Sequence, residues 1–138
     1  MKSRETVMRL KRFQVDEKRR RVAQIEMMIA DFERMATDLD REVAGEEQRA
    51  GISDKAHFAY PTYARAAMQR KENLVRSADE LKGQLLEARL ELEEAFEDLK
   101  KFEILEDREQ ARERAAEGVR EQVELDRIGI SMRGLARA

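Results

Sequence analysis

The residues of this chain that could carry chemistry are few, and they gather in one short stretch, residues 51–61. The only histidine, His57, lies there close to Asp54 and Tyr60, a combination of groups that can transfer protons or bind a metal. A metal site needs several converging ligands, and one histidine with scattered carboxylates does not supply them. The chain has no cysteine, so it forms neither a disulfide nor a thiolate site. We therefore interpret His57 as a loop histidine.

Sequence motifs of catalysis and cofactor binding are also missing. The sequence has no glycine-rich phosphate loop, no nucleophile elbow and no zinc-binding pattern. Its many carboxylates are spread along stretches of helical composition, where they form solvated faces instead of acid–base pairs. We expect no catalytic residue, no metal and no cofactor, and hence a protein that is not an enzyme.

The composition is that of long helices. Of the 138 residues, 42% are charged and 5% aromatic, with one proline and no tryptophan, which does not suit a compact globule. The commonest residues are strong helix formers, and a hydrophobic fraction of 41% is too high for simple disorder. The sequence predicts an all-α fold, namely a long antiparallel two-helix coiled coil with an extended C-terminal helix or tail.

The bend between the two helices follows from one glycine and the only proline. Gly51 favours the end of a helix near Ala50, and Pro61 favours the start of another. A short connection makes the two helices antiparallel neighbours. We treat the chain as a single coiled-coil domain with these parts: arm one, about 4–50; the bend, 51–61; arm two, about 62–127; and a flexible tail, 128–138.

Apolar residues recur in heptads on both arms and define a seam, the stripe of positions a and d. In arm one, position a holds Met8, Val15, Val22, Ile29, Ala36, Val43 and Ala50, and position d holds Lys11, Lys18, Ile25, Phe32, Leu39 and Glu46. In arm two the seam is Ala78, Leu81, Leu85, Ala88, Leu92, Ala95, Leu99 and Phe102. Its next positions are Glu106, Glu109 and Glu113, so we expect the apolar core to end after Phe102.

Charge supports antiparallel pairing. Residues 1–22 hold nine Lys or Arg and three acids (net +6), whereas residues 79–109 hold twelve acids and five bases (net −7). Antiparallel folding about the bend places these opposite blocks side by side.

The basic run at residues 18–21 raises an alternative, a generic coiled-coil scaffold or a nucleic-acid-associated protein that uses this basic arm. However, the seam passes through the run and the overall charge is −2, which favours pairing with the acidic arm. We expect no nucleic acid partner. The longest apolar run, residues 27–30, is far shorter than the roughly 20 residues of a membrane span, so we expect a cytoplasmic protein with no direct membrane insertion.

Some apolar residues near the expected open end of the hairpin lie off the seam. Leu10 and Phe13 occupy outward heptad positions, and Ile104 and Leu105 also lie off the seam. Packing among these residues themselves is the simpler interpretation, because single exposed apolar side chains need no explanation. The alternative is a partner-binding site at this end, to which the charged extension adds Arg120, Glu121, Gln122, Leu125 and Asp126.

Three stretches of the sequence are familiar: residues 10–19, the entry to arm two at residues 58–63, and residues 120–126 with the order Arg-Glu-Gln-Val-Glu-Leu-Asp. On these stretches the chain resembles the FliJ family of the bacterial flagellar type III export apparatus, particularly its alphaproteobacterial form. The resemblance covers nearly the whole chain. Its tail departs from the usual family ending, since apolar residues follow Arg127.

The resemblance implies a non-enzymatic component that couples the export ATPase to the export gate and assists the handling of chaperones and substrates. The implied partners are the hexameric export ATPase, the export gate membrane protein and export chaperones. The implied location is the cytoplasm, in peripheral association with the membrane-bound export apparatus.

Overall fold

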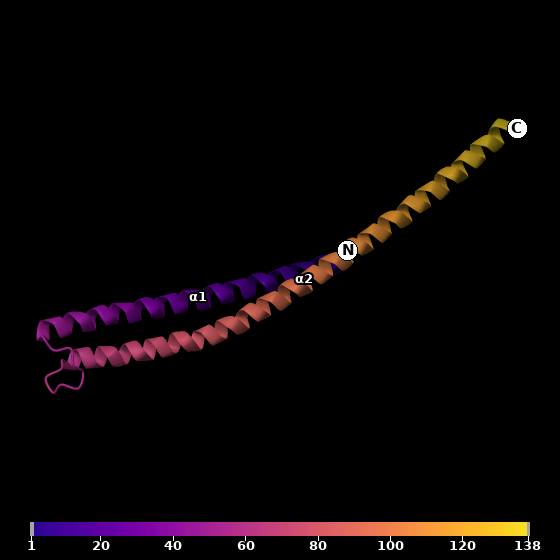
Figure 1. Ribbon diagram of the computed structural model, residues 1–138. Coiled ribbons are helices and arrows are strands. Elements are labelled where there is room, and N and C mark those ends of the chain that lie inside the picture. The colour runs from indigo at the N-terminus through magenta and orange to yellow at the C-terminus, as the bar shows by residue number, and fades with distance from the viewer. Residues whose placement is uncertain (1, 138) are drawn as a thin grey trace. The chain divides into compact units, whose positions relative to one another are not determined.

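The computed structural model describes residues 2–137 and contains two helices in that range (Figure 1). These are α1 (Lys2–Ala50) and α2 (Thr62–Arg137). They pack against each other as an antiparallel helical hairpin, and residues 2–137 include no strand. The predicted all-α coiled-coil hairpin is confirmed.

The bend begins where the sequence predicts it. Gly51 has a φ of 68°, the left-handed conformation in which glycine commonly ends a helix. The amide of Ile52 then donates to the carbonyl of Glu47 at 3.2 Å, which satisfies one of the last carbonyls of α1. At the other side, the carbonyl of Pro61 accepts from the amide of Arg65 at 3.1 Å and so opens α2. Proline suits this place because its missing N–H would have no helical partner there.

The chain divides into two compact units, which we describe separately. The bend unit comprises residues 13–95, and the terminal unit comprises residues 1–12 and 96–138. Each unit pairs a stretch of α1 with a stretch of α2.

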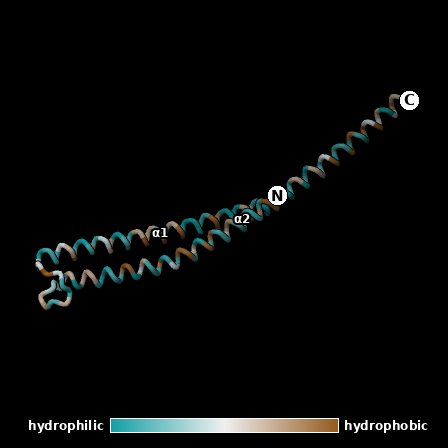
Figure 2. The backbone as a smooth tube through the Cα atoms, in the orientation of Figure 1, coloured by the Kyte–Doolittle hydropathy of each residue, from teal (hydrophilic) through white to brown (hydrophobic). Residues whose placement is uncertain are grey.

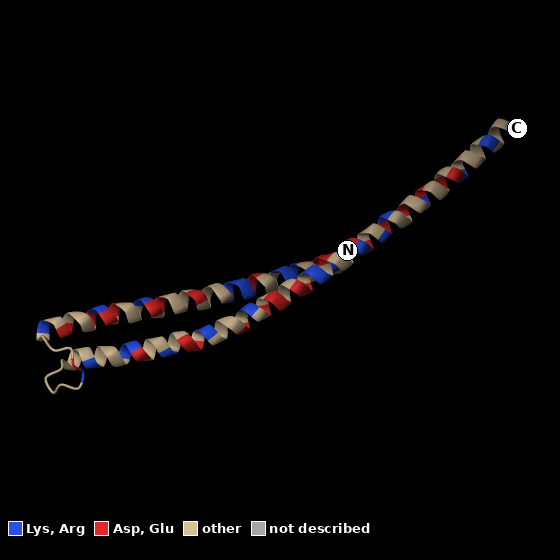
Figure 3. Ribbon diagram, viewed as in Figure 1, with Lys and Arg blue, Asp and Glu red and all other residues tan. Residues whose placement is uncertain are grey.

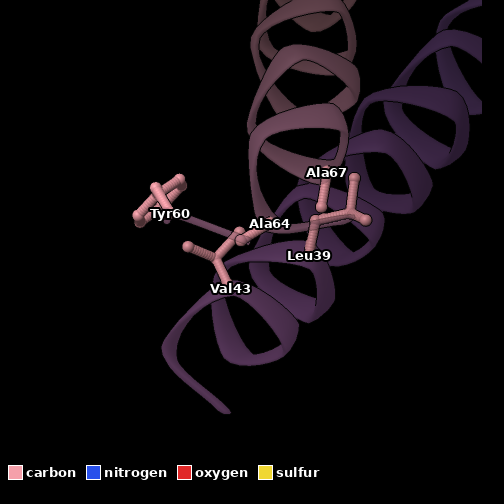
Figure 4. Close-up of a cluster of buried hydrophobic side chains, with 5 residues drawn as sticks. All are labelled: Leu39, Val43, Tyr60, Ala64 and Ala67. Carbon is pink, nitrogen blue, oxygen red and sulfur yellow. The ribbon is translucent and has the colours of Figure 1, made fainter. Parts of the chain in front are cut away.

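The core of the bend unit nearest the loop is one buried cluster (Figure 4). Its members are Leu39, Val43, Tyr60, Ala64 and Ala67. Alanines on α2 leave room for the larger side chains of α1, so the two backbones can approach closely. Tyr60 comes from the loop itself, and its hydroxyl donates to the carboxylate of Glu47 at 2.7 Å. This residue ties the loop to both helices.

A second cluster lies further along the bend unit and confirms the predicted register. Ile25 and Ile29 of α1 are buried with Leu81 and Ala88 of α2, and Leu85 packs against them. These are seam residues on both arms. Ile25 is the largest fully buried side chain of the described chain, at 1% exposure.

The structure extends the seam of α2 toward the bend beyond its predicted start at Ala78. Ala64 and Ala67 are buried and Leu74 is half-buried, at the same alternating spacing. Between them Lys71 is half-buried and pairs with Asp40 at 2.7 Å. In α1 the predicted seam is one position too long, because Ala50, the last residue of the helix, is exposed.

In the terminal unit the apolar seam gives way to charged residues. Leu99 is buried and Phe102 is half-buried, and the following seam positions Glu106, Glu109 and Glu113 are half-buried. The ammonium group of Lys11 lies 5.7 Å from the centre of the Phe102 ring and 2.5 Å from the carboxylate of Asp98. Polar side chains thus continue the pairing where the apolar core ends.

The helix α2 continues past residue 127, where the sequence predicts the end of arm two, to Arg137. Gly129 and Gly134 each cost a helix about 1 kcal/mol, but the residues around them are mostly good helix formers. Apolar residues recur up to this end of the helix (Figure 2). The flexibility of residues 128–138 stays a prediction.

Candidate functional site

The apolar residues predicted to lie off the seam are exposed. In the terminal unit, Leu10 is 53%, Ile104 51% and Leu105 60% exposed. Phe13 belongs to the bend unit, where it is also half-exposed and the guanidinium of Arg20 lies 5.9 Å from its ring centre. About half of the surface of each of these side chains is therefore accessible to solvent.

Arg4 organises the charged part of the terminal unit. Its guanidinium lies 2.6 Å from the carboxylate of Glu113 and 3.5 Å from that of Glu106. The hydrogen bond from Arg4 holds the pKa of Glu113 below its ordinary value, and the same bond raises the pKa of Arg4. This arrangement fixes the first turns of α1 on α2.

A shallow groove of about 290 Å³ lies beside this arrangement. Its lining residues are Arg4, Glu5, Met8, Arg9, Arg12, Glu106 and Gln110. Its lining combines three arginines with two glutamates and one apolar side chain, that of Met8.

The charged extension predicted to add to this site is a fully exposed stretch of α2. Arg120, Glu121, Gln122, Leu125 and Asp126 are all exposed. The side-chain amide of Gln122 donates to the carboxylate of Asp126 at 3.0 Å, one turn further along the helix. These contacts stay within α2, so the extension presents its side chains outward.

The loop histidine has a local role. The Nδ1 atom of His57 accepts from the amide of Ala59 at 3.0 Å, and its ring stacks on Phe58 with centroids 4.7 Å apart. Phe58 is 94% exposed. Among residues 2–137, no group of three or more His, Asp or Glu side chains could hold a metal ion.

A second surface, which sequence reasoning missed, lies in the bend unit. It is a groove of about 430 Å³ lined by Met35, Asp38, Leu39, Glu42, Tyr63, Arg70, Asn73, Leu74 and Ser77. The hydroxyl of Tyr63 donates to Glu42 at 2.8 Å across it, and this bond raises the pKa of Tyr63. Two residues in the sequence could have indicated this groove. Met35 is an apolar residue at the edge of the seam, and Tyr63 is an aromatic residue just after Pro61, the only proline.

In the ion pairs between α1 and α2, the helix that supplies the basic residue changes along α1. Toward its N-terminus the base is on α1 and the acid on α2, as in Arg4–Glu113, Lys11–Asp98 and Lys18–Glu91. Toward the bend the base is on α2, as in Arg89–Glu26, Lys82–Glu33 and Lys71–Asp40. Each pair lies within one unit. Figure 3 shows the blue and red residues that form this pattern.

The basic run at residues 18–21 is partly engaged by these contacts. Lys18 pairs with Glu91 at 2.9 Å, which lowers the pKa of Glu91 and raises that of Lys18. Arg19 pairs with Asp16 at 3.9 Å, and Arg20 lies over Phe13. Of these contacts only that of Lys18 joins the two helices, whereas Arg19 and Arg20 contact residues of their own helix.

A comparison with known families decides the identity of this hairpin. The sequence model described as "Flagellar FliJ protein" matches residues 1–137. The chain belongs to the FliJ family. No curated protein and no solved structure matches it. FliJ is a cytoplasmic, non-enzymatic component of the flagellar export apparatus, and it links the ATPase of that apparatus to the export gate. Neither helix of this FliJ chain, over residues 2–137, contains a segment long and apolar enough to cross a membrane.

Proposed function

We propose that this FliJ chain couples the hexameric export ATPase to the export gate by gripping the ATPase through its terminal unit. The contact residues are Leu10, Ile104 and Leu105, together with the charged extension of α2. Phe13, in the bend unit, is the remaining apolar contact. The observation that carries the proposal is the exposure of three large apolar side chains in the unit where the apolar seam gives way to half-buried glutamates.

Apolar and charged residues have different roles in such an interface. Apolar anchors that leave water on binding supply most of the affinity of an interface, whereas surrounding charges set its orientation. Leu10, Ile104 and Leu105 are such anchors, and the groove lined by Arg4, Arg9 and Arg12 offers charges in the same unit.

The same proposal covers the cellular location and the further partners of the protein. The chain works in the cytoplasm in peripheral association with the membrane-bound apparatus, and it contacts the export gate membrane protein and export chaperones. The stretches at residues 10–19, 58–63 and 120–126 support an alphaproteobacterial form of FliJ.

The test is the stimulation of ATP hydrolysis by the purified export ATPase from the same bacterium. Leu10→Ser combined with Ile104→Ser removes two exposed anchors, so we expect stimulation to fall about tenfold or more while helicity is unchanged. Truncation after Gln110 removes the extension and is expected to act in the same direction.

The matched control is Leu86→Ser combined with Leu90→Ser. These leucines are 62% and 53% exposed on α2 of the bend unit, so the control removes as much exposed apolar surface elsewhere. It should stimulate the ATPase like the unaltered chain. Full stimulation by the Leu10 and Ile104 variant would overturn the proposed contact and direct attention to the loop around Phe58 and Tyr63.

A further inference from the structure

The last turns of α2 differ in charge from the rest of the helix. Residues 103–126 hold nine acids and four arginines, whereas residues 127–138 hold three arginines and no acid. In Figure 3 the red residues of α2 end before its C-terminal stretch, while a blue residue remains. Within one helix, a solvated acidic segment thus changes to a purely cationic one.

The same turns carry an exposed apolar stripe. Leu125, Ile128, Met132 and Leu135 follow one another at spacings of three, four and three residues, so they lie on one face of the helix. All four are exposed, and Leu135 is 78% exposed. Of the nine other positions in residues 125–137, four hold small residues, namely Gly129, Ser131, Gly134 and Ala136, and four hold the charged Asp126, Arg127, Arg133 and Arg137. The ninth is Ile130, an exposed apolar residue on the opposite face.

We propose that residues 125–137 of α2 form an amphipathic helix that binds the surface of an anionic lipid bilayer. The stripe of Leu125, Ile128, Met132 and Leu135 lies in the boundary between head groups and acyl chains. Arg127 and Arg133 lie on either side of the stripe at helical spacing and attract the negative head groups. Such a helix lies in the plane of the interface and needs no apolar run of membrane-spanning length.

Charge complementarity favours a lipid surface over a second copy of the chain. A second copy would bring three further arginines toward the first three, with no acid after Asp126 to offset them. An anionic bilayer offsets all of them at once. The stripe and its arginines share only Leu125 with the proposed ATPase contact, and none of the variants below alters that residue, so the two proposals can fail independently.

The first test is co-sedimentation of the full chain with vesicles. We expect binding to vesicles of phosphatidylglycerol and phosphatidylcholine, weak binding to phosphatidylcholine alone, and release by salt. Met132→Ser combined with Leu135→Ser should abolish binding. Arg133→Gln should weaken it about fivefold, the effect of one arginine near an anionic surface.

The control variant is Val119→Ser combined with Val123→Ser. These valines are exposed on the acidic part of the same helix, so their loss removes apolar surface without touching residues 125–137. The control should bind vesicles as the unaltered chain does. Equal losses in the control and the stripe variant would overturn the proposal.

A second readout uses the absence of tryptophan from the chain. Met132→Trp places a single reporter on the stripe, and its fluorescence should shift to shorter wavelength when anionic vesicles are added. Val119→Trp should show no shift. If neither reporter shifts and the unaltered chain stays in the supernatant, the proposal is wrong. Sedimentation velocity without lipid gives a further check. If the unaltered chain is a dimer and the Met132→Ser, Leu135→Ser variant is a monomer, the stripe is a contact between copies and the proposal is wrong.

Discussion

Arg4 and Glu113 lie 109 positions apart in the chain, yet their side chains meet at 2.6 Å. This ion pair holds the first turns of α1, where the seam contains few apolar residues. We expect Glu113→Gln to accelerate amide hydrogen exchange in residues 4–12 without a change in the exchange of the bend unit. Hydrogen-exchange mass spectrometry measures both regions in one experiment.

Glu117→Gln is the matched control, because Glu117 is exposed one turn further along α2. It removes the same charge from the same helix and should leave exchange in residues 4–12 unchanged. Equal exchange in both variants would mean that the Arg4–Glu113 ion pair contributes nothing to the docking of this segment.

The same ion pairs predict a pH dependence. Hydrogen bonds from Lys18 and Arg4 hold the pKa values of Glu91 and Glu113 below the ordinary 4.5. A carboxylate whose pKa is lower in the folded chain stabilises it fully above 4.5, and this contribution is lost as the pH falls through the lower folded value. Circular dichroism melts between about pH 6 and about pH 3 should therefore lose midpoint temperature more steeply than those of a Glu91→Gln, Glu113→Gln variant. Parallel curves would contradict this.

The seam register predicts a large difference between two adjacent leucines. Leu85 packs against the cluster of Ile25 and Ile29, whereas Leu86 is 62% exposed. Leu85→Asp loses apolar contacts and places a carboxylate among apolar groups, so it should lower the free energy of unfolding by about 3 kcal/mol or more. Leu86→Asp should change it by less than about 0.5 kcal/mol. Urea titrations of the two variants compare these values directly, and coincident curves would overturn the register.

Two glycines should respond to the same substitution with opposite signs. Gly51 has a φ of +68°, where a Cβ atom is strained, so Gly51→Ala should destabilise the hairpin by about 1 kcal/mol. Gly83 lies within α2, and apart from its chain neighbours and the nearby helix backbone no atom lies within 4 Å of an added Cβ, so Gly83→Ala should stabilise by about 1 kcal/mol. Thermal melts of both variants test the sign. A stabilising Gly51→Ala would mean that α1 does not end in this conformation in solution.

The fold could be predicted from the sequence because the features that determine it are local and repetitive. The alternating spacing from Ala78 to Phe102 fixes one buried face of a helix, and Gly51 with Pro61 fixes the break between helices. Once the break is known, antiparallel pairing and the contact of Leu85 with Ile25 and Ile29 follow from counting residues.

What sequence reasoning missed depends on neighbours in space. Lys71 interrupts the apolar spacing, so the buried residues Ala64 and Ala67 were not assigned to the seam. In the structure Lys71 occupies a seam position because its ammonium group pairs with the carboxylate of Asp40 on α1. Tyr60 appeared to be one more loop aromatic, because the carboxylate that anchors it belongs to Glu47 on the other side of the bend. Leu10 and Ile104 could be proposed as partner contacts from their positions off the seam, but the contacts themselves could not be derived, since the partner supplies the other half of such a site.

The reversal of charge along α1 favours its antiparallel pairing with α2 over pairing with a second α1. A second chain aligned in parallel would place Lys11 and Lys18 against their own copies and Glu26 and Glu33 near theirs, so like charges would meet at both blocks. Another heptad protein would need the same reversal, at the same residue spacing, to compete with α2. The charge pattern therefore favours pairing of α1 with an α2 helix over parallel pairing of α1 with its own copy.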